Sequence, residues 1–143
     1  MEKLLDFRNK HEDTLTDVGL LAMRLWAGLA MLYAHGWGKL TNFSERVEGM
    51  DGFMHMPGEM AATLVVFAEV FCAGLLALGL TTRAVAVPLL ITMFIAAFVA
   101  HSGDPFGDRE LALFFGTAYL MLIFTGPGKY SVDHIIEKRW KAR

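Results

Sequence analysis

The fold of this chain is decided by residues 61–100, AATLVVFAEVFCAGLLALGLTTRAVAVPLLITMFIAAFVA. Two apolar segments, at 61–80 and 84–100, are joined there by the short polar link TTR at 81–83. About 20 apolar residues span a bilayer as a helix, so each segment is predicted to cross a membrane. Because the link is so short, the two helices are expected to form an antiparallel hairpin.

Two further apolar segments, at 18–35 and 111–125, extend this pattern on either side. The chain of 143 residues is 55% hydrophobic with a mean hydropathy of +0.42, which is too apolar for an ordinary soluble domain. The long link after the first segment is expected to hold a short helix over 43–47. The sequence therefore predicts one all-α domain over 1–143, an integral membrane, antiparallel four-helix bundle.

Both ends of the chain are predicted to form interfacial helices. Residues 1–16 mix charged and apolar side chains, and the helix after Ser131 places isoleucine and tryptophan opposite lysine and arginine. Lysine and arginine are concentrated at the two ends and in the link at 81–83. The positive-inside rule therefore predicts that both termini are cytoplasmic.

Arg24 and Glu69 are charged residues inside apolar segments. Charges at bilayer depth are costly and normally face the bundle interior, where they are paired or functional. Helical spacing and a rise of about 1.5 Å per residue bring the two within reach of each other, so an Arg24–Glu69 pair is predicted. The pair either takes part in chemistry, with Glu69 as a proton acceptor, or only holds the helices in register.

A second polar group is predicted at the outer ends of the segments, formed by His35, Lys39, His101 and Glu110. With the charge pair as its floor, this group would line a pocket open to the periplasmic side. Two imidazoles and a carboxylate could bind a metal or hold a quinone by its carbonyl oxygens. The alternatives are that the histidines are solvated at the interface and that Glu110 caps a helix N-terminus.

The link between the first two segments is rich in methionine, reading MDGFMHMPGEM at 50–60. Thioether sulfur suits copper(I), so Met54, His55 and Met56 are candidate copper ligands, with or without the two outer histidines. Methionine is common throughout the chain, with nine residues. The favoured interpretation is therefore that this segment packs as an apolar lid.

Two classes of function are excluded or disfavoured by composition. Cys72 is the only cysteine, which excludes a disulfide or dithiol mechanism within the chain. A formal net charge of -2 argues against a general nucleic-acid binder.

An ordered series of residues from Arg24 to Asp133 carries a family resemblance. The series comprises Arg24, Gly28, His35-Gly36, Lys39-Leu40, Glu69, Gly74-Leu75-Leu76, Gly79-Leu80, Thr82-Arg83-Ala84, Met93, Ala97, His101, Glu110-Leu111-Ala112, Gly126-Pro127-Gly128, Ser131 and Asp133. It resembles the DoxX family of small four-helix bacterial membrane proteins. The resemblance implies a relationship to the small subunit of thiosulfate:quinone oxidoreductase, and some members associate with sulfurtransferase and superoxide dismutase proteins.

The resemblance implies a multi-pass protein of the bacterial inner membrane with a quinone-linked redox role. The leading hypothesis is a redox-associated subunit that binds a quinone-like or other small ligand within the bundle. Its site residues would be Glu69 and Arg24 as the catalytic pair, with His35, Lys39, His101 and Glu110 contacting the ligand.

Two other functions stay open at this point. The chain could be a non-catalytic membrane anchor or assembly factor for soluble redox enzymes, docking them at its charged ends. It could instead bind copper or another metal at the periplasmic face, and the run Met54-His55-Met56 departs from the family pattern in a way that keeps this alternative. The expected partners are the lipid bilayer, soluble or membrane redox proteins and further copies of the chain.

Overall fold

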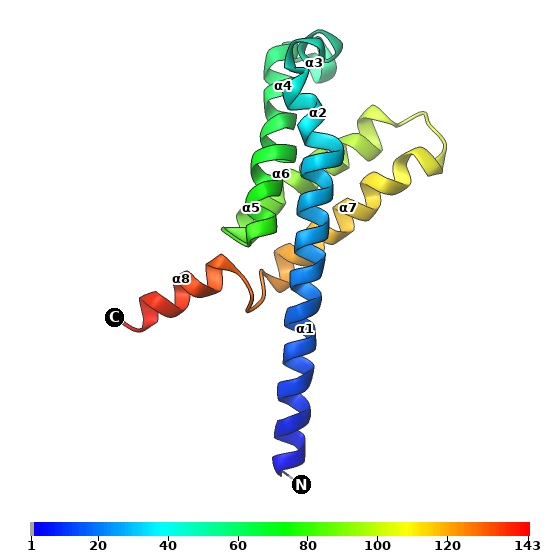
Figure 1. Ribbon diagram of the computed structural model, residues 1–143. Coiled ribbons are helices and arrows are strands. Elements are labelled where there is room, and N and C mark those ends of the chain that lie inside the picture. Colours follow the sequence, from blue (N-terminus) through cyan, green and yellow to red (C-terminus); the bar gives the residue numbers. More distant parts are fainter. Residues whose placement is uncertain (1) are drawn as a thin grey trace.

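The computed structural model describes the backbone of residues 2–143 and the side chains of residues 12–143. Over these residues the chain forms helices joined by short links, and no strand occurs among them. Figure 1 shows the helices packed in an elongated body, with the N-terminus at the free tip of the long first helix and the C-terminus on the last helix, which projects to the side. The all-α prediction is confirmed.

The first helical rod consists of α1 (Glu2–Ala30), the π-helical η1 (Met31–Gly36) and α2 (Trp37–Thr41), which follow one another without a break. At about 1.5 Å per residue the rod is roughly 60 Å long, about twice the hydrocarbon thickness of a bilayer. The prediction of a separate interfacial helix over 1–16 is wrong, because α1 passes through these positions into the first apolar segment.

Thr16 and Asp17 are residue types that often cap a helix N-terminus, but their side chains make other hydrogen bonds here. The Thr16 hydroxyl donates to the Glu12 carbonyl oxygen at 2.9 Å, one turn back within α1. The Asp17 carboxylate accepts from the Lys129 backbone N–H at 2.9 Å. Neither caps a helix here, so nothing interrupts α1 at this point.

The second rod follows a folded link. The link holds α3 (Phe43–Gly49) and a short 3-10 turn, η2 (Phe53–His55), so the predicted helix over 43–47 is confirmed. The rod itself consists of α4 (Gly58–Val66), the π-helical η3 (Phe67–Cys72) and α5 (Ala73–Leu78).

The second half of the chain begins after the turn at 79–81. It contains α6 (Thr82–Ile95) with the π-helical η4 (Ala96–Ala100), then α7 (Phe106–Thr125) and α8 (Val132–Lys141). The predicted cap of the last helix is confirmed, because the Ser131 hydroxyl accepts from the His134 backbone N–H at 3.1 Å.

Three helices are long and apolar enough to cross a membrane: Glu12–Thr41, Gly58–Leu78 and Thr82–Ala100. Helix α7 has 20 residues, but its first turns carry Asp108, Arg109 and Glu110. Of the four predicted spans, the first three therefore correspond to helices of spanning length. The fourth, at 111–125, is the apolar part of α7 that follows its charged first turns.

The helices pack as two pairs. Helix α1 lies along α5, and α6 lies along α7, with the second pair crossing behind the first (Figure 1). Small residues allow the closest contacts: a Cβ on Gly28 would lie 2.7 Å from the Ala73 carbonyl oxygen. Such close approach of backbones is typical of helices that associate in membranes. Between the pairs, the buried Tyr119 hydroxyl donates to the Ala27 carbonyl oxygen at 3.3 Å.

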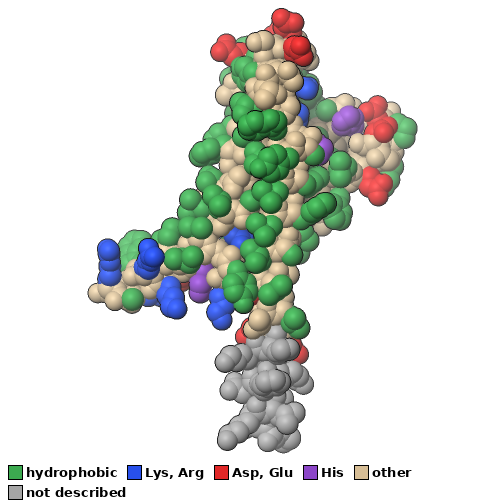
Figure 2. Space-filling view, in the orientation of Figure 1, with side chains coloured by type: hydrophobic (Ala, Val, Ile, Leu, Met, Phe, Trp, Pro, Cys, Tyr) green, Lys and Arg blue, Asp and Glu red, His purple; other side chains and the backbone are tan. Residues whose placement is uncertain are grey.

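The outside of the body is strongly apolar. Large side chains such as Trp26, Phe94 and Phe124 are 60% to 74% exposed, and Figure 2 shows hydrophobic side chains along the visible face of the helices. Soluble monomers rarely expose apolar patches of this extent. Together with the three apolar helices, this surface identifies a membrane protein whose sides contact lipid.

Candidate functional site

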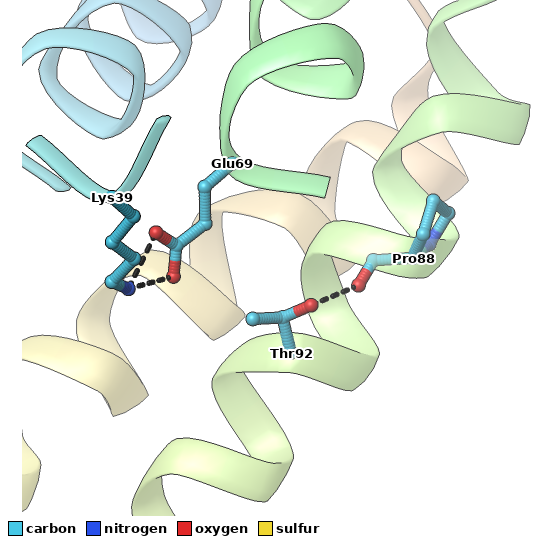
Figure 3. A network of polar contacts seen from close by, with 4 residues as sticks. All are labelled: Lys39, Glu69, Pro88 and Thr92. Atoms are coloured by element: carbon cyan, nitrogen blue, oxygen red, sulfur yellow. Dashed lines mark hydrogen bonds and ion pairs between the residues drawn. The ribbon is translucent and has the colours of Figure 1, made fainter. Parts of the chain in front are cut away.

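The centre of the site is an ion pair between Glu69 of η3 and Lys39 of α2. The Lys39 Nζ donates to Glu69 Oε1 at 2.6 Å and to Oε2 at 2.5 Å (Figure 3). The Glu69 side chain is 4% exposed and the Lys39 side chain 24%. Removing a carboxylate from water is costly, and a cation that contacts both of its oxygens offsets much of that cost.

The predicted Arg24–Glu69 pair is wrong. The first span was expected to end at His35, which left Lys39 in a link, whereas the helix continues to Thr41. This extension carries Lys39 to the level of Glu69 and into contact with it. Arg24 lies toward the other end of the same rod and makes different bonds.

Gly36 explains how α2 comes so close to the second rod. A Cβ built on Gly36 would lie 2.5 Å from the Glu69 carbonyl oxygen and 2.9 Å from Val70 Cγ2. Only glycine fits at this contact, so η1 rests directly on the backbone of η3. Lys39 follows three residues later and therefore faces the Glu69 carboxylate.

All three π-helical segments are associated with predicted site residues. His35 lies within η1, Glu69 lies within η3, and His101 follows η4 directly. π-helical turns are uncommon and occur frequently at functional sites, because the wider turn redirects side chains from the regular helical stripe.

A cavity of about 550 Å³ lies beside the ion pair, between the second rod and α6. Its walls are apolar and include Leu64, Phe67, Ile91 and Ile95. Several of these side chains are about half exposed on the outside of the body. The cavity is therefore continuous with the apolar surface that contacts lipid.

Residues 46–56, here called the roof segment, close the cavity at the end remote from the chain termini. Met50, Phe53, Met54 and Met56 contribute to its lining, whereas His55 does not. This arrangement agrees with the interpretation of the methionine-rich stretch as an apolar lid. Met54 and His55 have left-handed backbone angles, with φ of 52° and 61°, which cost free energy in residues other than glycine.

Few polar groups line the cavity. Besides Lys39 and Glu69, the polar side chains of its lining are Arg46, Thr92 and His101. The Thr92 hydroxyl donates to the Pro88 carbonyl oxygen at 2.9 Å on α6 (Figure 3), which leaves its oxygen able to accept. The His101 Nδ1 lies 2.7 Å from Asp104 Oδ2, in the link before α7.

The other predicted contact residues lie outside the cavity. The His35 ring packs edge-on against Phe115, with ring centroids 5.8 Å apart. Glu110 is exposed near the start of α7. Of the four polar residues expected to converge, the structure thus brings Lys39 and His101 to one cavity and leaves His35 and Glu110 outside its lining.

Within residues 12–143, no group of three or more histidine, cysteine, aspartate or glutamate side chains could hold a metal ion. Of the candidate copper ligands, Met54 and Met56 contribute to the cavity lining.

Arg24 belongs to a separate polar cluster at the end of the body near the chain termini. It is 1% exposed, and its Nη2 donates to the Tyr130 carbonyl oxygen at 2.6 Å. Its guanidinium occupies the space above Gly79, the left-handed residue that ends α5, and a Cβ there would overlap it. A cation at a helix C-terminus is favourable because the last carbonyl groups carry partial negative charge.

Asp133 completes this cluster. Its carboxylate accepts from the backbone N–H of Thr81 at 2.6 Å and of Thr82 at 2.9 Å, at the start of α6, and its charge interacts with that of Arg24. Sequence reasoning missed this role. The signal was a carboxylate two residues after the Ser131 cap, which usually serves its own helix.

A comparison with protein families matches residues 19–102, more than half of the chain, to DoxX. The chain belongs to the DoxX family. The matched range of this DoxX protein includes the polar side chains of the cavity lining, Lys39, Arg46, Glu69, Thr92 and His101. The resemblance inferred from the sequence is confirmed.

Three relatives of this DoxX chain are informative. A protein named inner membrane protein YqjF, from Escherichia coli strain K12, is 35% identical over 131 residues, covering 88% of this chain and 98% of the relative. An uncharacterized membrane protein, Rv3486 of Mycobacterium tuberculosis, is 34% identical over 50% of this chain and 52% of its own length. An uncharacterized protein of Haemophilus influenzae is 30% identical over 76% of this chain and 84% of its own length. No solved structure matches the chain significantly.

Proposed function

We propose that this DoxX protein is an inner-membrane, redox-associated subunit that binds a quinone-like molecule in the cavity beside Lys39 and Glu69. The observation that carries the proposal is an apolar cavity of about 550 Å³, open toward lipid, with one ion pair buried at its base. Small-molecule sites typically have such volumes, mostly apolar walls and a few well-placed polar groups.

The polar groups suit a ligand with carbonyl oxygens. An ammonium group has three N–H donors, and the contacts of Lys39 with Glu69 account for two of them. The third can donate to a ligand oxygen in the cavity. Glu69 is then placed to exchange a proton with that oxygen through Lys39, and the Thr92 hydroxyl oxygen can accept from the reduced ligand.

A quinone would supply two-electron, two-proton chemistry, with electrons exchanged with a redox partner protein. The His101–Asp104 pair lies at the exposed end of the cavity lining and provides a route for protons between the cavity and water. The protein's own contribution is thus to bind the ring, to exclude water with the apolar walls and to move protons.

The position of the walls favours a lipid-soluble ligand. Leu64 is 54% exposed, Phe67 47% and Ile91 53%, and all three belong to helices of membrane-spanning length. In a bilayer these side chains face acyl chains, so a ligand dissolved in the membrane reaches the cavity without crossing water.

The proposal includes an orientation. Helix α7 serves as the fourth span of an antiparallel bundle, with its charged first turns at the membrane surface. Both chain termini lie in the cytoplasm, as the distribution of lysine and arginine predicts, and the cavity then lies toward the periplasmic side.

The test uses the full chain in lipid nanodiscs, with decylubiquinone as the probe and empty nanodiscs as the reference. Lys39→Met should weaken binding about tenfold or more, since a hydrogen bond to a charged group contributes roughly 1.5–3 kcal/mol. Lys129→Met, the same substitution at an exposed lysine outside the cavity, should leave the affinity unchanged.

Because Lys39→Met leaves Glu69 buried without a partner, the double variant Lys39→Met/Glu69→Gln serves as the second arm. It removes both charges and avoids an unpaired carboxylate. If this double variant folds and binds decylubiquinone as tightly as the parent chain, the proposed site is wrong.

A further inference from the structure

Helix α8 leaves the helical body sideways, at the end where α5 and α6 are joined (Figure 1). It carries an apolar face that the body does not cover. Ile135 is 51% exposed, Ile136 49% and Trp140 80%. A ten-residue helix that leaves three such side chains uncovered is not stabilised by packing on its own chain, and an additional surface is needed to bury them.

The charges of α8 specify the kind of surface. Lys138, Arg139 and Lys141 lie in its last turn, and Arg143 follows. Figure 2 shows these basic side chains grouped along the projecting helix.

The acidic residues of α8 cancel only part of this charge, because Glu137 neutralises Lys141 and leaves Lys138, Arg139 and Arg143 without an acidic partner on this helix. Asp133 is bound to the start of α6, and Glu137 accepts from Lys141 at 2.5 Å, a hydrogen bond that holds the pKa of Glu137 below its usual value. The charge left to face a partner is therefore positive.

The base of α8 is fixed to the membrane end of the spans. The Asp133 backbone N–H donates to the Gly79 carbonyl oxygen at 2.9 Å, and its carboxylate binds the N–H groups of Thr81 and Thr82. These residues form the turn between two helices of spanning length. The helix therefore begins at the level where the spans leave the hydrocarbon, and its sideways direction keeps it there.

We propose that α8 lies on the surface of the bilayer that holds this chain and binds anionic phospholipids. Ile135, Ile136 and Trp140 insert at the boundary between headgroups and acyl chains, where tryptophan is favoured. Lys138, Arg139 and Lys141 contact the negatively charged headgroups. The Asp133 contacts fix the base of α8 at the level of the lipid headgroups. The bilayer is therefore favoured as the partner over a soluble protein, because its surface already lies against the apolar face of α8.

The test isolates Trp140 as the only tryptophan. The chain contains three, so Trp26→Phe and Trp37→Phe define the parent protein. It is reconstituted into nanodiscs of phosphatidylcholine with or without phosphatidylglycerol, using lipids brominated near the headgroup end of the acyl chains. We expect Trp140 fluorescence to be quenched at least about twofold more in the anionic discs, and the difference to decrease at high salt.

Two variants separate charge from side-chain shape. Lys138→Glu/Arg139→Glu/Lys141→Glu should abolish the extra quenching in anionic discs, whereas Lys138→Arg/Lys141→Arg should retain it. Both variants change only exposed residues, so the far-UV circular dichroism spectrum of the protein should stay the same.

Three results would overturn the proposal. The first is Trp140 emission typical of water, without quenching, in anionic discs. The second is quenching of equal size in both lipids, at all salt concentrations and in the triple variant. Such a result would show that the interaction does not depend on anionic headgroups. The third is burial of Trp140 only after a cytosolic protein is added, which would make that protein the partner.

Discussion

Glu69 shows what a single residue in a sequence can reveal. A carboxylate inside an apolar segment predicts a buried, paired group, and the structure places Glu69 at such a position. The identity of its partner depended on where the first helix ends. The first apolar segment was bounded at residue 35, so Lys39 was placed in the link that follows it. Gly36 instead permits the contact that brings Lys39 to Glu69.

This account predicts a specific effect of Gly36→Ala. The new Cβ would lie 2.5 Å from the Glu69 carbonyl oxygen, so the two rods must separate. Overpacking of this kind typically destabilises by about 1–3 kcal/mol. We expect a lower thermal unfolding midpoint in detergent and weaker binding of decylubiquinone.

Gly38→Ala is the matched control, because a Cβ on Gly38 would have no atom within 4 Å apart from its chain neighbours and the backbone of its own helix. It should be neutral or slightly stabilising, since alanine favours helices more than glycine does. Equal melting temperatures for the two variants would show that the Gly36 contact does not hold the rods at this distance.

At the scale of elements, short-range signals predicted much of the structure. The short turn between the second and third segments was recognisable from segment lengths, although it lies at 79–81 and not at the predicted 81–83. The helix in the long first link was recognisable in the same way, and the Ser131 cap from residue type. The continuity of α1 was not predicted, because the mixture of charged and apolar side chains over residues 1–16 resembles a separate interfacial helix. The π-helical turns of η1, η3 and η4 were not predicted, because the pattern of apolar residues in a single segment does not distinguish them from regular helix.

The Arg24–Asp133 cluster makes an element-scale prediction. Asp133→Asn keeps the size of the side chain but removes the negative charge at the start of α6 and beside Arg24. Loss of a helix cap costs about 0.5–2 kcal/mol, and the loss of charge near Arg24 adds to it. We expect a lower unfolding midpoint and faster proteolysis after residue 128.

Asp13→Asn provides the comparison for this variant, since Asp13 is exposed on α1. Its effect should be small. Binding of decylubiquinone should be unchanged in both variants, because the cluster lies at the other end of the body from the cavity. A loss of ligand affinity in Asp133→Asn would show that the two sites are coupled.

At the scale of the whole molecule, apolar segment lengths predicted an all-helical membrane protein, and the ordered polar residues predicted its family. How the helices cross could not be predicted, because it depends on which side chains meet between rods. The α6–α7 pair crosses the α1–α5 pair, and this crossing leaves the cavity between the second rod and α6. Of the residues predicted to form the pocket, Lys39, Glu69 and His101 line the observed cavity. Arg24, His35 and Glu110 do not belong to its lining.

The central claim is that this cavity holds a quinone-like ligand, and photoaffinity labelling tests it most directly. The full chain in nanodiscs is irradiated with an azidoquinone, with and without excess decylubiquinone, and labelled peptides are located by mass spectrometry. The account predicts competed labelling in the roof segment, residues 46–56, and on the cavity faces of α4 and α6 around Leu64 and Ile91. Labelling that excess decylubiquinone does not reduce, or that is confined to α1, α7 and α8, would contradict it.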